Sequence, residues 1–140
     1  MSIGRNYLRN TRDYRETHNI RQTLLSDSTW RNNSLSSITE YNNMNLPLEI
    51  ITQSYTSPDY VEVKNDWRYT YDYNSNGDEI LKIRYDWDEE IEWIYDDYIE
   101  TFYDEEFRYT GSISKKWDGY EWVNERRDLR EYDALNNISY

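Results

Sequence analysis

The sequence has no cysteine and few of the residues that usually build a dry protein core. Without cysteine the chain has no disulfide, no thiolate metal ligand and no cysteine nucleophile. Its 140 residues include only 2 Phe and 2 Met, against 16 Tyr and 6 Trp. Tyr and Trp suit half-buried positions, in which the ring packs and the polar group stays in water. We therefore expect a folded chain without a large dry core, because disordered chains are poor in aromatic residues.

Basic residues are scarce beyond the first 60 residues. Residues 61–140 carry ten Lys and Arg against twenty-two acids, which accounts for the whole net charge of −12. Binding to nucleic acid or to an anionic membrane depends on basic residues, so we expect neither partner. No apolar run approaches the roughly 20 residues that span a bilayer. Residues 1–12 have no apolar signal-peptide segment, so an export signal would lie upstream of this sequence.

Tyrosine recurs at intervals of 27, 30, 32 and 29 residues, each time near an Asn- or Asp-rich turn sequence. A regular period of this length indicates a repeat architecture. These tyrosine positions are Tyr14, Tyr41, Tyr71, Tyr103 and Tyr132.

Two further sets of positions keep the same phase. The positions of one set precede the next tyrosine position by 10 or 11 residues. Those of the other set precede the first set and are separated from it by a polar segment of four or five residues. Three sets in register over four units predict a tandem repeat. They are the second-arm positions Trp30, Tyr60, Trp93 and Trp122, and the first-arm positions Leu25, Tyr55, Trp87 and Trp117.

Each unit is typical of a β-hairpin, because two segments rich in Tyr, Trp, Ile, Val and Thr flank a short polar loop. Every connection is short, so consecutive strands should be antiparallel neighbours. The expected fold is an all-β, antiparallel up-and-down meander of tandem hairpins of about 30 residues, an open-ended sheet of about eight complete strands. The first arms are 20–25, 48–55, 79–87 and 112–117, and the second arms are 30–41, 60–71, 93–103 and 122–132.

The whole chain, 1–140, is expected to be a single array that starts and ends inside a unit. No polar capping unit is recognisable at either end, so each end of the sheet should present unpaired backbone groups. Either the chain is a window of a longer array, or copies join head to tail, with the basic first unit against the acidic last ones. The divisions are a partial unit 1–13, units at about 14–40, 41–70, 71–102 and 103–131, and a partial unit 132–140.

The stretch WDGYEWVN, followed ten residues after its second Trp by YDALNNI, resembles the tandem repeats of proteins secreted by bacteria with a type IX secretion system. A weaker similarity is to the YD repeats of Rhs-type shells. The resemblance implies an extracellular or cell-surface location and repetition. This sequence departs from the family pattern at Leu25, Tyr55 and Tyr60, which replace Trp, and at Phe107, where Asn or Gly is usual.

His18 is the only histidine and a candidate general base. We favour a turn position for it, equivalent to Asn45 and Asn136, because Asn and His are enriched among residues with positive φ. The sequence also has no pocket-forming insertion and no nucleophile–base pair, so we expect no enzyme activity.

The stretch DYNSNG at 72–77 matches the start of a calcium-binding loop, with Asp72, Asn74, Asn76 and Asp78 as candidate ligands. The full motif needs a bidentate Glu at its twelfth position, which is Ile83 here. We favour an Asn-Gly hairpin turn and expect no other metal or cofactor.

Residues 86–106 hold eleven acids and no Lys or Arg. A cation-binding face and a solvated face that discourages unwanted strand pairing are both open, and we favour the solvated face. The acids are Asp86, Asp88, Glu89, Glu90, Glu92, Asp96, Asp97, Glu100, Asp104, Glu105 and Glu106.

The tryptophans allow two interpretations. Exposed Trp87, Trp93, Trp117 and Trp122 could stack on sugar rings, or they could form a cross-strand packing ladder, which their fixed phase favours. The leading hypothesis is a non-enzymatic extracellular structural protein that assembles end to end into a filament or surface matrix. The alternatives are an adhesin module that binds glycans or proteins through its Tyr/Trp face, and a passive spacer.

Overall fold

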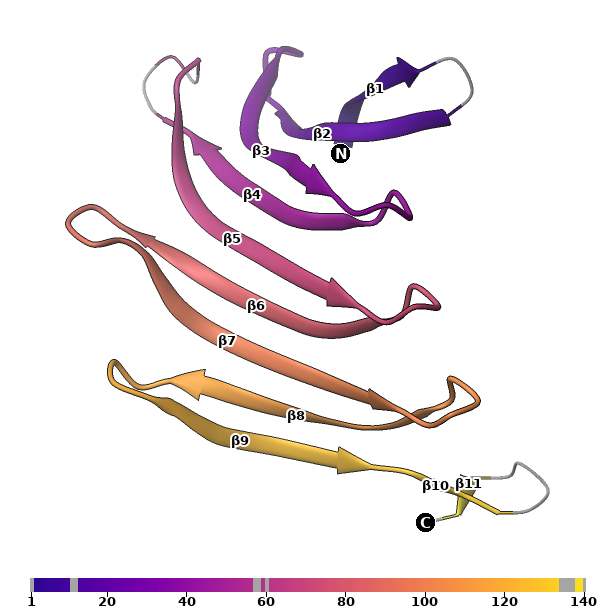
Figure 1. The fold of residues 1–140 in the computed structure, drawn as a ribbon. Helices are drawn as coiled ribbons and strands as arrows, with labels where there is room; N and C mark the ends of the chain where they lie inside the picture. The colour runs from indigo at the N-terminus through magenta and orange to yellow at the C-terminus, as the bar shows by residue number, and fades with distance from the viewer. Residues whose placement is uncertain (1, 11–12, 57–58, 60, 134–137, 140) are drawn as a thin grey trace. The chain divides into compact units, whose positions relative to one another are not determined.

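The computed structural model describes residues 2–10, 13–56, 59, 61–133 and 138–139, and the side chains from residue 18 to residue 133 within those ranges. All the regular secondary structure in these residues is β-strand (Figure 1). The strands are β1 (Ser2–Asn10), β2 (Asp13–Leu24), β3 (Trp30–Tyr41), β4 (Pro47–Tyr55), β5 (Val63–Tyr73), β6 (Glu79–Asp88), β7 (Glu92–Tyr103), β8 (Tyr109–Trp117), β9 (Trp122–Leu129), β10 (Glu131–Tyr132) and β11 (Ile138–Ser139).

The predicted antiparallel meander is confirmed. Strands β1 to β9 form one sheet in chain order, and β10 pairs with β11 in a separate two-stranded sheet (Figure 1). The sheet does not close, so β1 and β9 are its edge strands. The eight predicted arms correspond to β2 through β9, and the predicted partial unit 1–13 contains β1.

The start of the chain differs from the expectation. Strand β2 covers twelve residues, and His18 lies within it, opposite Asn6 on β1 and Ser37 on β3. The predicted turn position for His18 is therefore wrong. Tyr14 lies near the start of β2, opposite Arg9, because the chain reverses before it and not after it.

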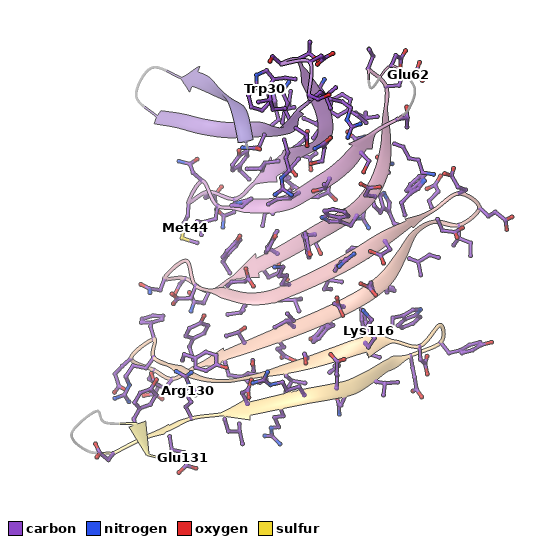
Figure 2. All side chains as sticks on the ribbon, turned by 180° about the vertical axis from the view of Figure 1, so that it is seen from behind. Trp30, Met44, Glu62, Lys116, Arg130 and Glu131 are labelled. Atoms are coloured by element: carbon purple, nitrogen blue, oxygen red, sulfur yellow. The ribbon has the colours of Figure 1, made fainter. Side chains whose placement is uncertain are left out.

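The chain divides into two compact units, which are described separately below. Unit 1 contains Met1–Tyr69 and Asp86–Ile94, and unit 2 contains Thr70–Tyr85 and Tyr95–Tyr140. Among the side chains that the structure describes, no apolar one is buried (Figure 2). In unit 1 the buried side chain is that of Thr52, 5% exposed, whose hydroxyl lies 2.9 Å from that of Ser36 on the neighbouring strand. Stability must therefore come from backbone ladders and cross-strand side-chain pairs.

Candidate functional site

Three turns at the same end of the hairpins share one geometry. After β3, the backbone amide of Asn42 donates to the carbonyl of Leu46 at 2.9 Å, and the Asn42 side-chain oxygen accepts the amides of Met44 and Leu46 at 2.9 and 3.0 Å. Asn74 after β5 and Asp104 after β7 make the same pairs. An Asn or Asp side chain that accepts amides two or more residues ahead is the usual way to fix such a turn.

This geometry changes one of the predicted tyrosine positions. Tyr41, Tyr73 and Tyr103 each end a strand directly before the turn residue, whereas Tyr71 lies two residues earlier, inside β5. Tyr71 and Tyr73 stack with ring centroids 6.3 Å apart. Tyr73, and not Tyr71, is therefore the equivalent of Tyr41 and Tyr103.

Each turn also needs one residue with positive φ, at 61° for Asn45, 89° for Gly77 and 60° for Phe107. A bulky residue in this left-handed region costs roughly 1–2 kcal/mol relative to glycine. Phe107 is 46% exposed, so its ring gains little by packing. We expect Phe107→Gly to raise the free energy of unfolding by about 1 kcal/mol.

Urea denaturation monitored by circular dichroism would measure this gain. Glu105→Gly is the matched control, because Glu105 lies in the same turn without a positive φ and should not be stabilised by glycine. Equal effects of the two substitutions would contradict a φ-based explanation.

The candidate calcium ligands build the turn between β5 and β6. The Asn74 side-chain oxygen accepts the backbone amides of Asn76 and Asp78 at 3.0 and 2.9 Å. The Asp78 carboxylate accepts the side-chain amides of Asn74 and Asn76 at 3.0 and 3.1 Å. Asp72 lies earlier, inside β5. Over the described part of the chain, no group of three or more acidic or histidine side chains is placed to hold a metal ion.

Basic side chains on neighbouring strands form ion pairs with three acids of residues 86–106. In unit 2, Arg84 on β6 lies 3.3 Å from Asp96, and Lys116 on β8 lies 2.6 Å from Asp96 and 2.9 Å from Asp97. Hydrogen bonds to Asp96 and then Asp97 raise the pKa of Lys116. In unit 1, Lys64 lies 2.6 Å from Glu89. These pairs are exposed or half-buried, which agrees with a solvated face, and an exposed pair such as Lys64 with Glu89 contributes about 0–1 kcal/mol.

At the opposite ends of the hairpins, Asp27, Asp88 and Asp118 accept backbone amides in the turns after β2, β6 and β8. The Asp118 carboxylate accepts the backbone amides of Glu121 and Tyr120 at 2.9 and 2.8 Å. These hydrogen bonds hold the pKa of Asp118 below its usual 3.8. A carboxyl group with a depressed folded-state pKa adds stability above its unfolded-state pKa, and that stability is lost as the pH falls through the folded-state pKa.

We expect Asp118→Asn to lower the free energy of unfolding at about pH 7, because an ionised acceptor binds amides more strongly than a neutral one. The difference from wild type should shrink between about pH 7 and pH 2, as the Asp118 carboxylate takes up a proton. Urea denaturation at the two pH values would test this. Glu105→Gln removes one charge from an exposed acid of another turn and provides the control. A difference for Asp118→Asn that persists unchanged in acid would contradict the prediction.

The tryptophans and tyrosines pack on one another across strands. In unit 2, Trp117 and Trp122 are register partners with ring centroids 5.3 Å apart, and Tyr95 lies 5.2 Å from each of them. Tyr85 lies 5.1 Å from Tyr95, and Tyr98 lies 5.5 Å from Trp122. We call these five residues the aromatic cluster.

Unit 1 contains a second pair of this kind, Trp87 with Trp93, whose ring centroids are 5.0 Å apart. Trp30 starts β3 opposite Leu24. Leu25 follows β2, and Tyr55 ends β4. Tyr60 lies outside the described residues, as does the side chain of Tyr14, and Tyr132 ends β10.

The sequence prediction did not include Tyr85 or Tyr95. Each lies two residues from a predicted tryptophan, Trp87 and Trp93 respectively, and residues two apart on a strand point to the same face. That spacing is a sequence feature from which both tyrosines could have been found.

A shallow pocket of about 370 Å³ lies in unit 2, over β5, β6 and β7. The Tyr98 hydroxyl donates to the Glu100 carboxylate at 3.2 Å, and burial followed by the Glu100 charge raises the pKa of Tyr98. The Tyr103 hydroxyl donates to the backbone carbonyl of Glu79 at 3.3 Å. The lining residues are Asp72, Ile80, Leu81, Tyr98, Glu100, Thr101, Phe102 and Tyr103.

No helix in the described residues is long and apolar enough to cross a membrane. No protein-family model matches the chain, and no curated protein sequence matches it.

Solved structures do share its fold. A protein of unknown function from Bacteroides fragilis NCTC 9343 is 9% identical, with a TM-score of 0.66 over 92% of this chain and 91% of that chain. A DUF3836 family protein from Bacteroides vulgatus ATCC 8482 is 14% identical, with a TM-score of 0.54 over 66% of this chain and 91% of that one. Another, from Parabacteroides distasonis ATCC 8503, is 18% identical, with a TM-score of 0.51 over 69% and 89%. At these identities the similarity is one of fold: an antiparallel β-meander.

Proposed function

We propose that this chain is a non-enzymatic structural β-repeat protein that self-associates by adding a strand at the free edge of β9. The observation that carries the proposal is the open sheet: β9 lies at its edge, and an edge strand offers a row of backbone donors and acceptors to another chain. Extracellular location and assembly into a filament or matrix belong to the proposal, and the resemblance to secreted tandem repeats supports them.

Two features near this edge support strand addition. Val123 and Leu129, near the two ends of β9, are 47% and 64% exposed, so each end presents an apolar side chain to an incoming strand. Directly after β9, Tyr132 and Glu131 on β10 pair with Ile138 and Ser139 on β11. The segment that directly follows β9 therefore already pairs its backbone with a further strand, β11.

The charge near β9 argues against a large electrostatic contribution to the association of two copies. Residues 115–133 carry five basic and six acidic residues, so the β9 end is nearly neutral and the acid excess lies in residues 86–106. Attraction between a basic first unit and an acidic last unit is therefore weak at the edge itself. Backbone pairing and the apolar side chains must supply most of the association energy.

Analytical ultracentrifugation over a range of concentrations tests the proposal. We expect wild type to form larger species as concentration rises, visible as fibrils or sheets by electron microscopy. The variant carrying Val123→Lys and Leu129→Lys should stay monomeric, because charged side chains block edge pairing. Ile91→Lys is the control, since Ile91 is 69% exposed in the hairpin loop between β6 and β7 and is not part of β9. A wild-type protein that is monomeric at every concentration would refute the proposal.

A further inference from the structure

The pocket of unit 2 has the size of a ligand site. Its volume of about 370 Å³ falls in the range of small-molecule pockets, roughly 300–1,000 Å³. Its apolar walls come from Ile80, Leu81 and Phe102, on β6 and β7. Such walls hold the aliphatic or flat part of a ligand, while a few polar groups select its chemistry.

The polar groups of the pocket are mainly acceptors. Asp72 and Glu100 bring two carboxylates, and the lining contains no Lys, Arg, His, Asn or Gln. The hydroxyls of Tyr98 and Tyr103 already donate, to Glu100 and to the carbonyl of Glu79. Thr101 lies between Glu100 and Phe102 on β7, so its side chain points to the opposite face, and the pocket offers a ligand few side-chain donors. A sugar hydroxyl both donates and accepts, whereas an ammonium or guanidinium group only donates.

A lysine beside the pocket does not cancel the negative charge of its lining. Lys115 lies 4.7 Å from the centroid of the Tyr98 ring, a cation–π distance, and is not a lining residue. With Lys115 counted, Asp72 and Glu100 still leave the pocket with a net negative charge. The remaining aromatic wall, Phe102, offers a second ring against which a cation can pack.

We propose that this pocket binds a small organic cation, namely an ammonium or guanidinium group carried on a short aliphatic chain. The carboxylates of Asp72 and Glu100 accept the N–H groups, and Ile80, Leu81 and Phe102 contact the aliphatic part. The cation comes either from a free amine or from a Lys or Arg side chain of a peptide.

The test is a titration of the full ¹⁵N-labelled chain, followed by NMR at the backbone amides of Leu81, Thr101 and Phe102. Agmatine stands for a free amine, and N-acetyl-arginine amide for a peptide side chain. Xylose, maltose and glutarate are the neutral and anionic probes. We expect saturable shifts with one or both cations, weakened by added salt, and none with the other three. Binding of agmatine alone assigns the site to free amines with two cationic ends, binding of N-acetyl-arginine amide alone assigns it to a peptide side chain, and binding of both assigns it to the shared guanidinium group.

Charge-removing variants of nearly the same shape make the test specific. Asp72→Asn and Glu100→Gln should each weaken cation binding at least fivefold. Glu105→Gln removes an exposed acid outside the lining and should leave binding unchanged. Unchanged urea midpoints of the variants would show that they still fold. Equal affinity of all three variants for the cation would overturn the proposal. Binding of a sugar in place of the cation would overturn it as well.

Discussion

Trp122→Ala should lower the free energy of unfolding by about 2–3 kcal/mol. Trp122 starts β9 and lies 5.2–5.5 Å from three other rings, those of Tyr95, Trp117 and Tyr98. Aromatic pairs of this kind contribute roughly 0.5–1.5 kcal/mol each beyond the area they bury. Because the indole is only half-buried, the loss should stay below that of a fully buried Trp, about 3–5 kcal/mol.

Urea denaturation followed by far-UV circular dichroism would measure the loss without relying on tryptophan fluorescence. Tyr120→Ala is the control, because Tyr120 lies two residues away in the adjoining turn and is 92% exposed. It should change the free energy by less than about 0.5 kcal/mol. Trp122→Phe should recover part of the loss, since a smaller ring keeps some contacts. If the alanine variants at 120 and 122 were equally stable, the aromatic cluster would not be a source of stability.

Gly111→Ala should cost about 2–3 kcal/mol by separating β8 from β9. A Cβ atom at Gly111 would lie 2.4 Å from the backbone oxygen of Asp128 and 3.3 Å from the Cα of Leu129. The backbones approach this closely beside the hydrogen bond from the amide of Arg130 to the carbonyl of Thr110, 2.8 Å long. Neither backbone can move without breaking the ladder between the two strands.

Hydrogen exchange measured by NMR would localise the effect, with faster exchange in β8 and β9 than in the strands of unit 1. Gly119→Ala separates steric from conformational cost. A Cβ there meets no atom within 4 Å, but the φ of 105° is unfavourable for alanine, so the expected cost is about 1 kcal/mol. A larger loss at Gly119 than at Gly111 would contradict the steric explanation.

The hairpins could be predicted from the sequence because their ends carry rings and turn residues at a constant phase. The pattern predicts Tyr71 where the structure has Tyr73, because both tyrosines precede an Asx residue, Asp72 or Asn74. The deciding feature lies three residues after the Asx residue, where the turn needs a positive φ. Gly77 supplies it after Asn74, whereas Ser75 would have to supply it after Asp72.

Other features depended on pairing that the sequence does not show. His18 was placed in a turn because a short first arm was expected, and only the pairing with β1 reveals the longer β2. The predicted arm 112–117 excludes Gly111, which lies inside β8, although a glycine inside a strand often marks a close backbone approach. The pocket combines side chains from three strands, and their registers decide whether Asp72 and Glu100 line one cavity.

The lack of buried apolar side chains in the described residues has a thermodynamic consequence. Exposure of apolar surface is what makes the heat capacity of unfolding large and positive, about 12–15 cal/mol/K per residue in ordinary domains. A chain whose described apolar side chains are half-buried or exposed should unfold with a smaller heat-capacity change. Its stability should then vary gently with temperature and resist denaturation by cold.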